Sequence, residues 1–476
     1  MEIKKSKGFT LGEQKVAQIC ENSFLSLWSY PNLFYSPNKE LCDVLIVFGD
    51  FVLIISEKTS KFNTDTADIA VEWGRYKRRI IDKSYRQLRG AENWLKRFPD
   101  RLFLDAACTQ PFPLHIRKDA RFIKISVING LDEINQMRDN AAEDSGVFLP
   151  PDMQIFDMAV NEYVHLLDDR TFPILFSELD TALDLISYFV KKEELIQSGK
   201  MLFVPPENDL LVTFLSNFDA SNGEHCFVPC EQSVDMIVID NPTDPYEKYV
   251  RQESVKRKKI ANLCSYMWDN IIERYNRSIL EDQTIDNMNF AEKVKIAEIL
   301  ASENRYHRRV LVEKLQTARS SFRPSSERLV VCMSSPFNKQ LAYACVFLRK
   351  HPSETKEQYR RKAFALMNTY PKAIKLKCPH YKRILCFVCT VSAEAEDMFF
   401  SFFDKELSST DVEQVNLWEK KYGIGANITP VAFCHTPEYP QCPEDLKVTM
   451  SKKIPVNAKC PCGSGKKYKK CCGRLY

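Results

Sequence analysis

Residues 39–62 read KELCDVLIVFGDFVLIISEKTSKF, and this stretch decides the fold expected of the N-terminal region. Two apolar runs flank Gly49-Asp50, a dipeptide that fits the two-residue turn of a β-hairpin. Both runs are apolar enough for central strands of a sheet. Polar side chains nevertheless stand at the hairpin's end, Asp43 on one strand and Ser56–Lys58 on the other. Because polar groups there cost free energy unless they are paired or functional, they are candidate site residues.

The turn fixes which of these side chains share a face. A two-residue turn at Gly49-Asp50 makes Asp43 face Ser56 across the hairpin. Lys58 is two residues further on and lies on the same face as both, because side chains alternate along a strand. Glu57 then points to the opposite face.

A metal site needs a second carboxylate beside Asp43, and two arrangements supply one. A β-bulge near Ile55-Ser56 would turn Glu57 inward, and bulges do occur beside active sites. Alternatively, a carboxylate from elsewhere in the chain completes the site, with Glu21, Glu40 and Glu72 as candidates. If neither occurs, the domain binds nucleic acid without cutting it.

The segment after the hairpin predicts a long basic helix. RYKRRIIDKSYRQLRGAENWLKRFPDR (75–101) places Ile81, Tyr85, Leu88, Glu92 and Leu95 at helical spacing. The segment has ten Lys or Arg residues against three acids. Basic side chains beside a catalytic hairpin suit contacts with phosphates.

This arrangement resembles the PD-(D/E)XK, or restriction-endonuclease-like, nuclease superfamily. The resemblance implies that Asp43 and Glu57 hold Mg²⁺ and that Lys58 orients the attacking water or the phosphate. It also implies a supporting role for Gln87 on the basic helix, and a glutamate on the preceding helix, where Glu13 and Glu21 are candidates. Ser56 departs from the pattern, because it stands where the family has an acid.

The end of the chain, CPCGSGKKYKKCCGRLY (460–476), predicts a small zinc site. Cys460 and Cys462 are separated from Cys471 and Cys472 by eight residues that include two glycines. Two close thiol pairs across such a turn can wrap one tetrahedral Zn²⁺. A peptide this short buries too little apolar surface to fold alone, so metal binding would supply its folding free energy.

The tail closely resembles the SEC-C motif, a zinc-binding module best known from the translocation ATPase SecA. The spacing C-x-C-x8-C-C, the Gly-Ser-Gly turn and the Lys-Lys-Tyr run all match. The resemblance implies docking to a protein partner or to nucleic acid rather than an activity. Because the chain has no Walker-type phosphate loop, it is not SecA itself.

The composition limits the class of protein to which the chain can belong. The chain has 476 residues, 44% hydrophobic and 27% charged, which is typical of ordinary globular domains. No long apolar run predicts a membrane span, and the N-terminus lacks the apolar core of a signal peptide. Seventeen cysteines without such a signal favour a reducing cytoplasm. Residues 451–476 carry eight basic and no acidic residues, so the net charge of +4 comes from the tail.

The expected fold class is mixed α/β. We expect a nuclease-like α/β domain at 1–130, a mostly helical region at 131–320, a second α/β region at 321–440 and the zinc tail at 446–476. In the second α/β region, RLVVCM and RILCFVCTV predict strands, and AEAEDMFFSFFDKEL predicts a helix.

Two further groups of metal-ligand residue types are more simply read as structural. Cys386 and Cys389 lie in an apolar strand near Cys378 and His380, but on opposite faces of that strand. GEHCFVPC (223–230), with His225, Cys226 and Cys230, has the same interpretation.

The sequence therefore predicts a Mg²⁺-dependent nuclease, with DNA favoured as substrate, and a zinc tail. A nuclease-like head with such a tail resembles bacterial host-defence proteins. The alternative is a non-catalytic, zinc-dependent adaptor whose head is a degenerate nuclease fold, and Ser56 favours that alternative.

Overall fold

The structure is a computed structural model of the chain. It describes residues 2–59, 69–129, 155–157, 162–201, 206–228, 245–284, 288–323, 325–336, 338–390, 399–425 and 437–440, with the isolated positions 237, 239, 428, 430–431 and 467. The chain forms two compact units. Unit 1 comprises residues 1–219 and 225–250, and unit 2 comprises residues 220–224 and 251–476.

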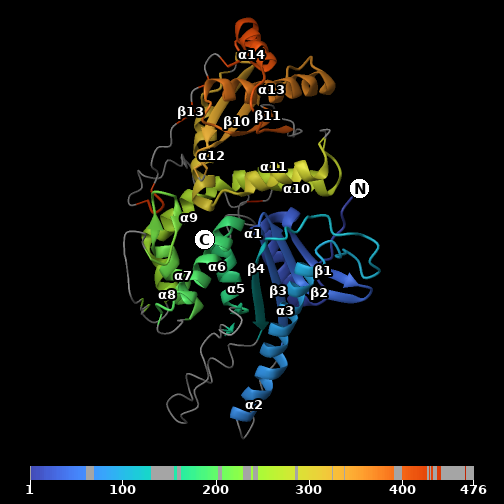
Figure 1. Ribbon diagram of the computed structural model, residues 1–476. Coiled ribbons are helices and arrows are strands. Elements are labelled where there is room, and N and C mark those ends of the chain that lie inside the picture. Colours follow the sequence, from blue (N-terminus) through green and yellow to red (C-terminus); the bar gives the residue numbers. More distant parts are fainter. Residues whose placement is uncertain are drawn as a thin grey trace. The chain divides into compact units, whose positions relative to one another are not determined.

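Unit 1 begins with a capped helix and the expected hairpin (Figure 1). Thr10 caps helix α1 (Leu11–Trp28) by accepting a hydrogen bond from the Glu13 backbone N–H at 3.1 Å. Strands β1 (Ser29–Ser36), β2 (Lys39–Phe48) and β3 (Phe51–Thr59) follow as an antiparallel meander. Phe48 pairs with Phe51 and Val44 with Ile55, so the predicted turn and register are confirmed.

One mixed sheet forms the centre of unit 1, in the order β1-β2-β3-β4-β6-β5. Strand β4 (Arg121–Asn129) runs parallel to β3, and β6 (Glu162–Asp168) runs parallel to β4. Strand β5 (Ile155–Asp157) pairs antiparallel with β6 at the edge. Unit 1 therefore continues past residue 130, where the sequence placed the end of its first domain.

The long basic helix is present and consists of three consecutive segments. They are α2 (Ile69–Tyr76), the π-helix η1 (Lys77–Ile81) and α3 (Asp82–Arg97). Ser84 of α3 bonds Ser126 of β4 at 2.7 Å, and Glu92 of α3 bonds Lys124 of the same strand. Helix α3 therefore runs antiparallel to β4, and η1 and α2 continue past the carboxyl end of β4 (Figure 1).

Apolar helices and short strands complete unit 1. Helix α6 begins at the cap Thr181, whose side chain accepts from the Asp184 backbone N–H. The buried side chains of α5, α6 and α7 include Leu175, Phe189 and Phe214. The elements are α5 (Thr171–Glu178), α6 (Ala182–Gln197), α7 (Glu207–Ser216), β7 (Phe218–Asp219), β8 (Glu224–His225) and α8 (Pro245–Arg251). The boundary between the units falls within β8 and before the last residue of α8.

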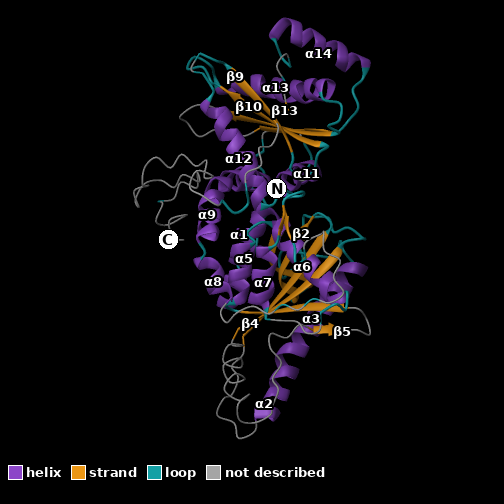
Figure 2. Cartoon of the chain, turned by 90° about the vertical axis from the view of Figure 1, so that its left-hand side faces the viewer, coloured by secondary structure: helices purple, strands orange, loops and turns teal. Residues whose placement is uncertain are grey.

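Unit 2 contains a second sheet, in the order β12-β11-β10-β9-β13 (Figure 2). Helix α13, which begins with a capping box at Thr355, covers one face through Ala363, Leu366 and Ile374. The strands and covering helices are β9 (Arg328–Ser334), β10 (Leu341–Leu348), β11 (Arg383–Thr390), β12 (Phe399–Phe403), β13 (Pro430–Val431), α13 (Lys356–Lys377) and α14 (Ser409–Tyr422).

Helices from the first half of unit 2 pack on the opposite face of this sheet or on one another. The Trp268 ring makes edge-on contacts with Tyr343 of β10 and Phe387 of β11. These helices are α9 (Glu253–Asn262), the 3-10 helix η2 (Leu263–Ser265), α10 (Tyr266–Leu280), α11 (Phe290–Ala301) and α12 (Arg305–Ser320).

The strands predicted at RLVVCM and RILCFVCTV are confirmed as β9 and β11, but the helix predicted at AEAEDMFFSFFDKEL is wrong in its described part. Residues Phe399–Phe403 form β12, paired antiparallel with β11 from Val388–Phe399 to Ile384–Phe403. The phenylalanines suit a strand packed against a sheet edge, and this tertiary pairing outweighed the helical pattern of the segment.

Candidate functional site

Asp43 and Lys58 meet at the end of the β2–β3 hairpin. Their carboxylate and ammonium groups are 3.6 Å apart, and the side chains are only 7% and 19% exposed. The Asp43 Oδ2 atom accepts a hydrogen bond from the backbone N–H of Glu57 at 2.5 Å. Burial raises the pKa of Asp43, and the nearby Lys58 charge opposes that rise. The pair predicted from the hairpin register is therefore formed.

Glu57 lies away from this pair. Its carboxylate accepts hydrogen bonds from the Thr59 hydroxyl at 2.6 Å and from the Asn129 amide. It also lies against the backbone of Gly12 in α1, where an added Cβ would stand 2.5 Å from Oε1. The strand pairing from Val44–Ile55 outward to the turn is regular. The geometry thus favours a carboxylate from another segment over a bulge that turns Glu57 inward.

Glu40 lies on the same strand as Asp43, and the charges of the two carboxylates interact. Asn32, fully buried on β1, donates from Nδ2 to Glu40 at 2.6 Å and to Glu13 at 3.0 Å. Burial, together with the negative charges of Asp43 and Glu13, raises the pKa of Glu40 to about 7. Such mutual repulsion among buried carboxylates is what a bound cation relieves. Glu21 is exposed on α1, and Glu72 forms ion pairs with Arg75 and Arg79 on the basic helix.

Glu13 is the α1 glutamate that reaches this network. Burial opposes its ionisation, but hydrogen bonds from Asn32, Phe9 and Thr10 outweigh burial and hold its pKa below the ordinary value. Asn32 has a positive φ of 50°, a conformation that asparagine tolerates better than most residues. Sequence reasoning missed Asn32, because nothing in a strand pattern marks an amide that bridges two carboxylates.

The side-chain oxygen atoms of these residues are of the chemical type that binds Mg²⁺, but they do not form a complete coordination shell. Carboxylate oxygens are the ligands that Mg²⁺ prefers. Within the described residues, no group of three His, Cys, Asp or Glu side chains stands close enough to hold a metal ion.

Ser56 and Gln87 border the same face of the sheet. Ser56 is fully buried and pairs in register with Ser126 of β4, which bonds Ser84 of α3. Gln87 is half-buried on α3, three residues after Ser84. The predicted apolar stripe of this helix is largely confirmed, because Ile81, Leu88, Glu92 and Leu95 are buried.

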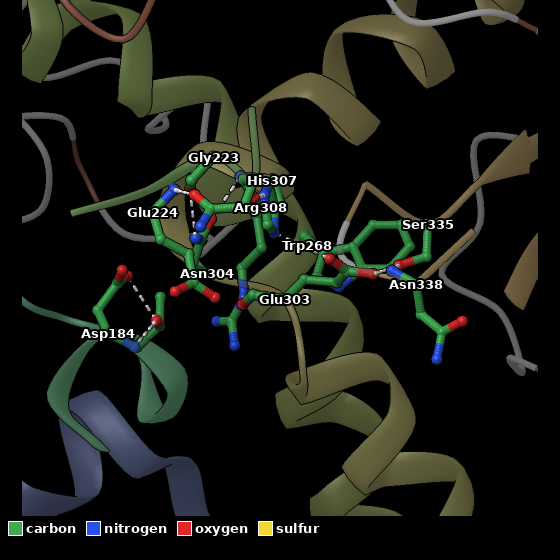
Figure 3. Close-up of polar contacts among 12 residues, drawn as sticks. Asp184, Gly223, Glu224, Trp268, Glu303, Asn304, His307, Arg308, Ser335 and Asn338 are labelled. Carbon is green, nitrogen blue, oxygen red and sulfur yellow. Dashed lines mark hydrogen bonds and ion pairs between the residues drawn. The ribbon is translucent and has the colours of Figure 1, made fainter. Parts of the chain in front are cut away.

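A buried polar cluster in unit 2 was not foreseen (Figure 3). The Glu303 carboxylate accepts from the Ser335 hydroxyl and from the Tyr343 hydroxyl at 2.9 Å, and it lies 3.3 Å from Nδ1 of His307. Arg308 bonds Asp269 at 2.7 Å, and that contact, with Arg305, keeps the pKa of Asp269 below its ordinary value despite burial. These contacts join the helices to the sheet, and we assign them a structural role.

The cysteine groups outside the tail have distinct surroundings. Cys386 is fully buried on the α13 side of the sheet, whereas the thiols of Cys389 and Cys345 are 3.8 Å apart on the other side. The predicted opposite orientation of Cys386 and Cys389 is thereby confirmed. Cys226 lies beside Asn217, and Cys230 is outside the described residues.

The tail cysteines Cys460, Cys462, Cys471 and Cys472 also lie outside the described residues. Comparison with protein families nevertheless matches the SEC-C motif at residues 457–474, so the predicted motif is confirmed. The match covers the tail alone and assigns no family to the rest of the chain.

Matches to known proteins point to the same motif. A protein translocase subunit SecA from Campylobacter curvus is 64% identical over 31 residues, which are 6% of this chain and 4% of that protein. SecA subunits from a Janthinobacterium species and from Herminiimonas arsenicoxydans are each 29% identical, over 129 and 133 residues respectively. These two matches cover 27% of this chain and 13% of each relative. No solved structure matches.

Among the described helices, none has the length and apolar character needed to cross a lipid bilayer.

Proposed function

We propose that unit 1 is a metal-dependent phosphodiesterase that cleaves DNA. The main supporting observation is the largely buried Asp43–Lys58 pair at the end of the hairpin, with Glu40 on the same strand as Asp43. The order α1-β1-β2-β3-α2-η1-α3-β4, with β3 parallel to β4, supports this proposal because it sets the pair at one end of the sheet.

In this proposal Asp43 and Glu40 hold Mg²⁺, and Glu13 and Asn32 fix the position of Glu40. The metal supplies charge stabilisation at the scissile phosphate. Lys58 orients the attacking water or the phosphate. Hydrolysis consumes one water, whose oxygen forms a new bond to phosphorus while the bond to the leaving oxygen breaks, and that oxygen takes up a proton. Glu57 has no role in the chemistry, and Gln87 supports the site from α3.

A cleavage assay tests the proposal. Purified full-length protein is incubated with plasmid, linear and single-stranded DNA and with RNA, in Mg²⁺, Mn²⁺ or EDTA. We expect metal-dependent cutting that Asp43→Asn and Glu40→Gln abolish and that Glu21→Gln, an exposed carboxylate on α1, leaves intact. Cutting that persists in Asp43→Asn overturns this site.

The second candidate is a non-catalytic adaptor with the same fold. The buried Ser56 at the family's acid position favours it, because the site then has fewer carboxylates than a nuclease of this family. Calorimetric titration with Mg²⁺ separates the two candidates. Binding that is lost in Asp43→Asn supports the nuclease, whereas no Mg²⁺ binding supports the adaptor.

For the tail we propose a structural Zn²⁺ held by Cys460, Cys462, Cys471 and Cys472, in a module that docks a protein partner or nucleic acid. The motif match supports this role. We also propose a reducing, cytoplasmic location, since no two of the described cysteines form a disulfide with each other.

A further inference from the structure

The exposed surface of the basic helix is mainly cationic. Between residues 71 and 97, leaving out Trp73, eleven residues are exposed and none of them is acidic. Eight of the eleven are basic, namely Arg75, Lys77, Arg78, Arg79, Lys83, Arg86, Lys96 and Arg97. We call α2, η1 and α3 together the basic arm.

The three acids of the basic arm, Glu72, Asp82 and Glu92, neutralise only part of this surface, and none of them is exposed. Glu92 is buried and bonds Lys124 and Lys96, the latter at 2.6 Å. Glu72 is buried and lies 3.6 Å from Arg75 and 3.8 Å from Arg79. Within the part of the chain that the structure describes, Lys77, Arg78 and Lys83 have no ion-pair partner, and all three residues are exposed.

The basic arm leaves the sheet at the end where Asp43 and Lys58 lie. The contacts of α3 with β4 set the helix antiparallel to that strand, so the N-terminal part of the arm extends past the carboxyl end of β4 (Figure 1). In the parallel β3–β4 ladder Lys58 pairs with Ile128, one step before that end. A ligand bound along the arm would therefore reach the candidate site.

We propose that the basic arm is a docking surface for duplex DNA, which it holds against the Asp43–Lys58 site. This inference rests on the proposed function, because it supplies the substrate class of that site. The choice of duplex DNA as the ligand rests on the length of the arm and on its positive charge.

Length and stiffness favour a duplex. The arm contains 29 helical residues, in segments of 8, 5 and 16. Its length is roughly 40 Å at 1.5 Å per residue, slightly more than one turn of B-DNA. The π-helical turn η1, a feature often found at functional sites, contains the consecutive basic residues 77–79 between α2 and α3.

Single strands and duplex RNA fit the arm less well. Proteins that bind single strands stack bases on exposed aromatic rings, and none of the eleven exposed residues is aromatic. An α-helix fits the major groove of B-DNA, whereas the corresponding groove of A-form RNA is too narrow to admit side chains.

The test is fluorescence anisotropy with the full-length chain and a labelled DNA duplex, in EDTA so that no cutting occurs. The arm variant is Lys77→Gln/Arg78→Gln/Lys83→Gln. The control, Lys15→Gln/Lys118→Gln/Lys420→Gln, removes the same charge from exposed lysines elsewhere. We expect the arm variant to lose at least about tenfold in affinity and the control to change little. The dependence of log affinity on log salt should become less steep by about 0.9 for each phosphate contact removed.

Several results would overturn the proposal. These are equal weakening by the arm and control variants, tighter binding of single-stranded DNA or duplex RNA than of duplex DNA, and no binding of duplex DNA by the unaltered chain. Asp43→Asn separates this proposal from the nuclease. Duplex binding without cutting by the unaltered chain keeps the arm and removes the nuclease. Cutting that is lost in Asp43→Asn but unchanged in the arm variant supports the nuclease and removes the proposed role of the arm.

Discussion

The Lys58 ammonium lies 3.6 Å from the Asp43 carboxylate, and the backbone N–H of Glu57 donates to the same carboxylate oxygen. One buried carboxylate is thus held by two groups of the neighbouring strand. Burial makes its ionised form costly, and these two contacts offset part of that cost.

Removing the lysine charge should therefore destabilise unit 1 more than removing both charges. We expect Lys58→Met to lower the free energy of unfolding by about 2 kcal/mol, because it leaves Asp43 buried without its partner. Asp43→Asn/Lys58→Met should recover much of that loss. Urea denaturation of the single and double variants measures the coupling. Additive effects of the two substitutions would show that the pair contributes no interaction energy.

Unit 1 should lose stability in mild acid because of His165. Burial lowers the pKa of this histidine in the folded state, and the hydrogen bond to Glu193 at 3.1 Å opposes the shift without reversing it. The charges of Lys192 and Glu207 face the same ring. In the unfolded chain the pKa is about 6.5, so the unfolded chain takes up the proton first as pH falls. The contribution of His165 to the free energy of unfolding is fully present above about pH 6.5, and it is lost as the pH falls towards the pKa of the folded state.

Denaturation midpoints measured from pH 7.5 down to about 5 test this sign. His165→Gln should flatten the decline even where it lowers stability at every pH. His351→Gln, which alters an exposed histidine, should leave the decline unchanged. A profile of the same slope in the His165 variant would assign the acid sensitivity to other groups.

The hairpin was predictable because local rules fix it. Gly49 has a φ of 57°, as the turn requires, and alternation then places Asp43 and Lys58 on one face. The Glu40–Asn32–Glu13 network was not predictable, because it depends on how α1 and β1 pack on the hairpin. The second sheet also contains a strand that the local sequence pattern did not predict. Phe399–Phe403 is a strand because it pairs with β11.

The chain should contain about one tightly bound zinc, as expected for a single four-thiolate site. Cys471→Ser should lose it, because three thiolates hold the ion less well than four. Cys108→Ser, which alters a cysteine in a loop of unit 1, is the matched control and should retain it. Elemental analysis after dialysis measures the stoichiometry. Zinc retained equally by both variants would move the site away from the tail.

Of the two neighbouring thiols, Cys389 should react with iodoacetamide before Cys345. Its pKa is lowered chiefly by the hydrogen bond from the Cys345 thiol, with help from Arg319 and Arg274, whereas burial raises the pKa of Cys345. The thiolate is the nucleophile, so its fraction at neutral pH sets the rate. Peptide mapping by mass spectrometry gives the order of labelling. Cys345→Ala, which removes the donor, should slow the reaction at Cys389, and an unchanged rate would mean that the neighbouring thiol does not activate it.

Gly223→Ala should destabilise unit 2 by about 2–4 kcal/mol, because it combines two costs. Gly223 has a φ of 72°, and an added Cβ would stand 2.4 Å from Nε2 of His307. The same glycine accepts a hydrogen bond from Asn304 at 2.7 Å through its carbonyl, so it cannot shift without loosening the cap of α12. Gly423→Ala is the matched control, since Gly423 has a φ of 62° but no atom near the added Cβ. It should cost only about 1 kcal/mol, the backbone part alone. Equal losses in the two variants, measured by thermal denaturation of the full chain, would show that His307 yields to the new methyl group.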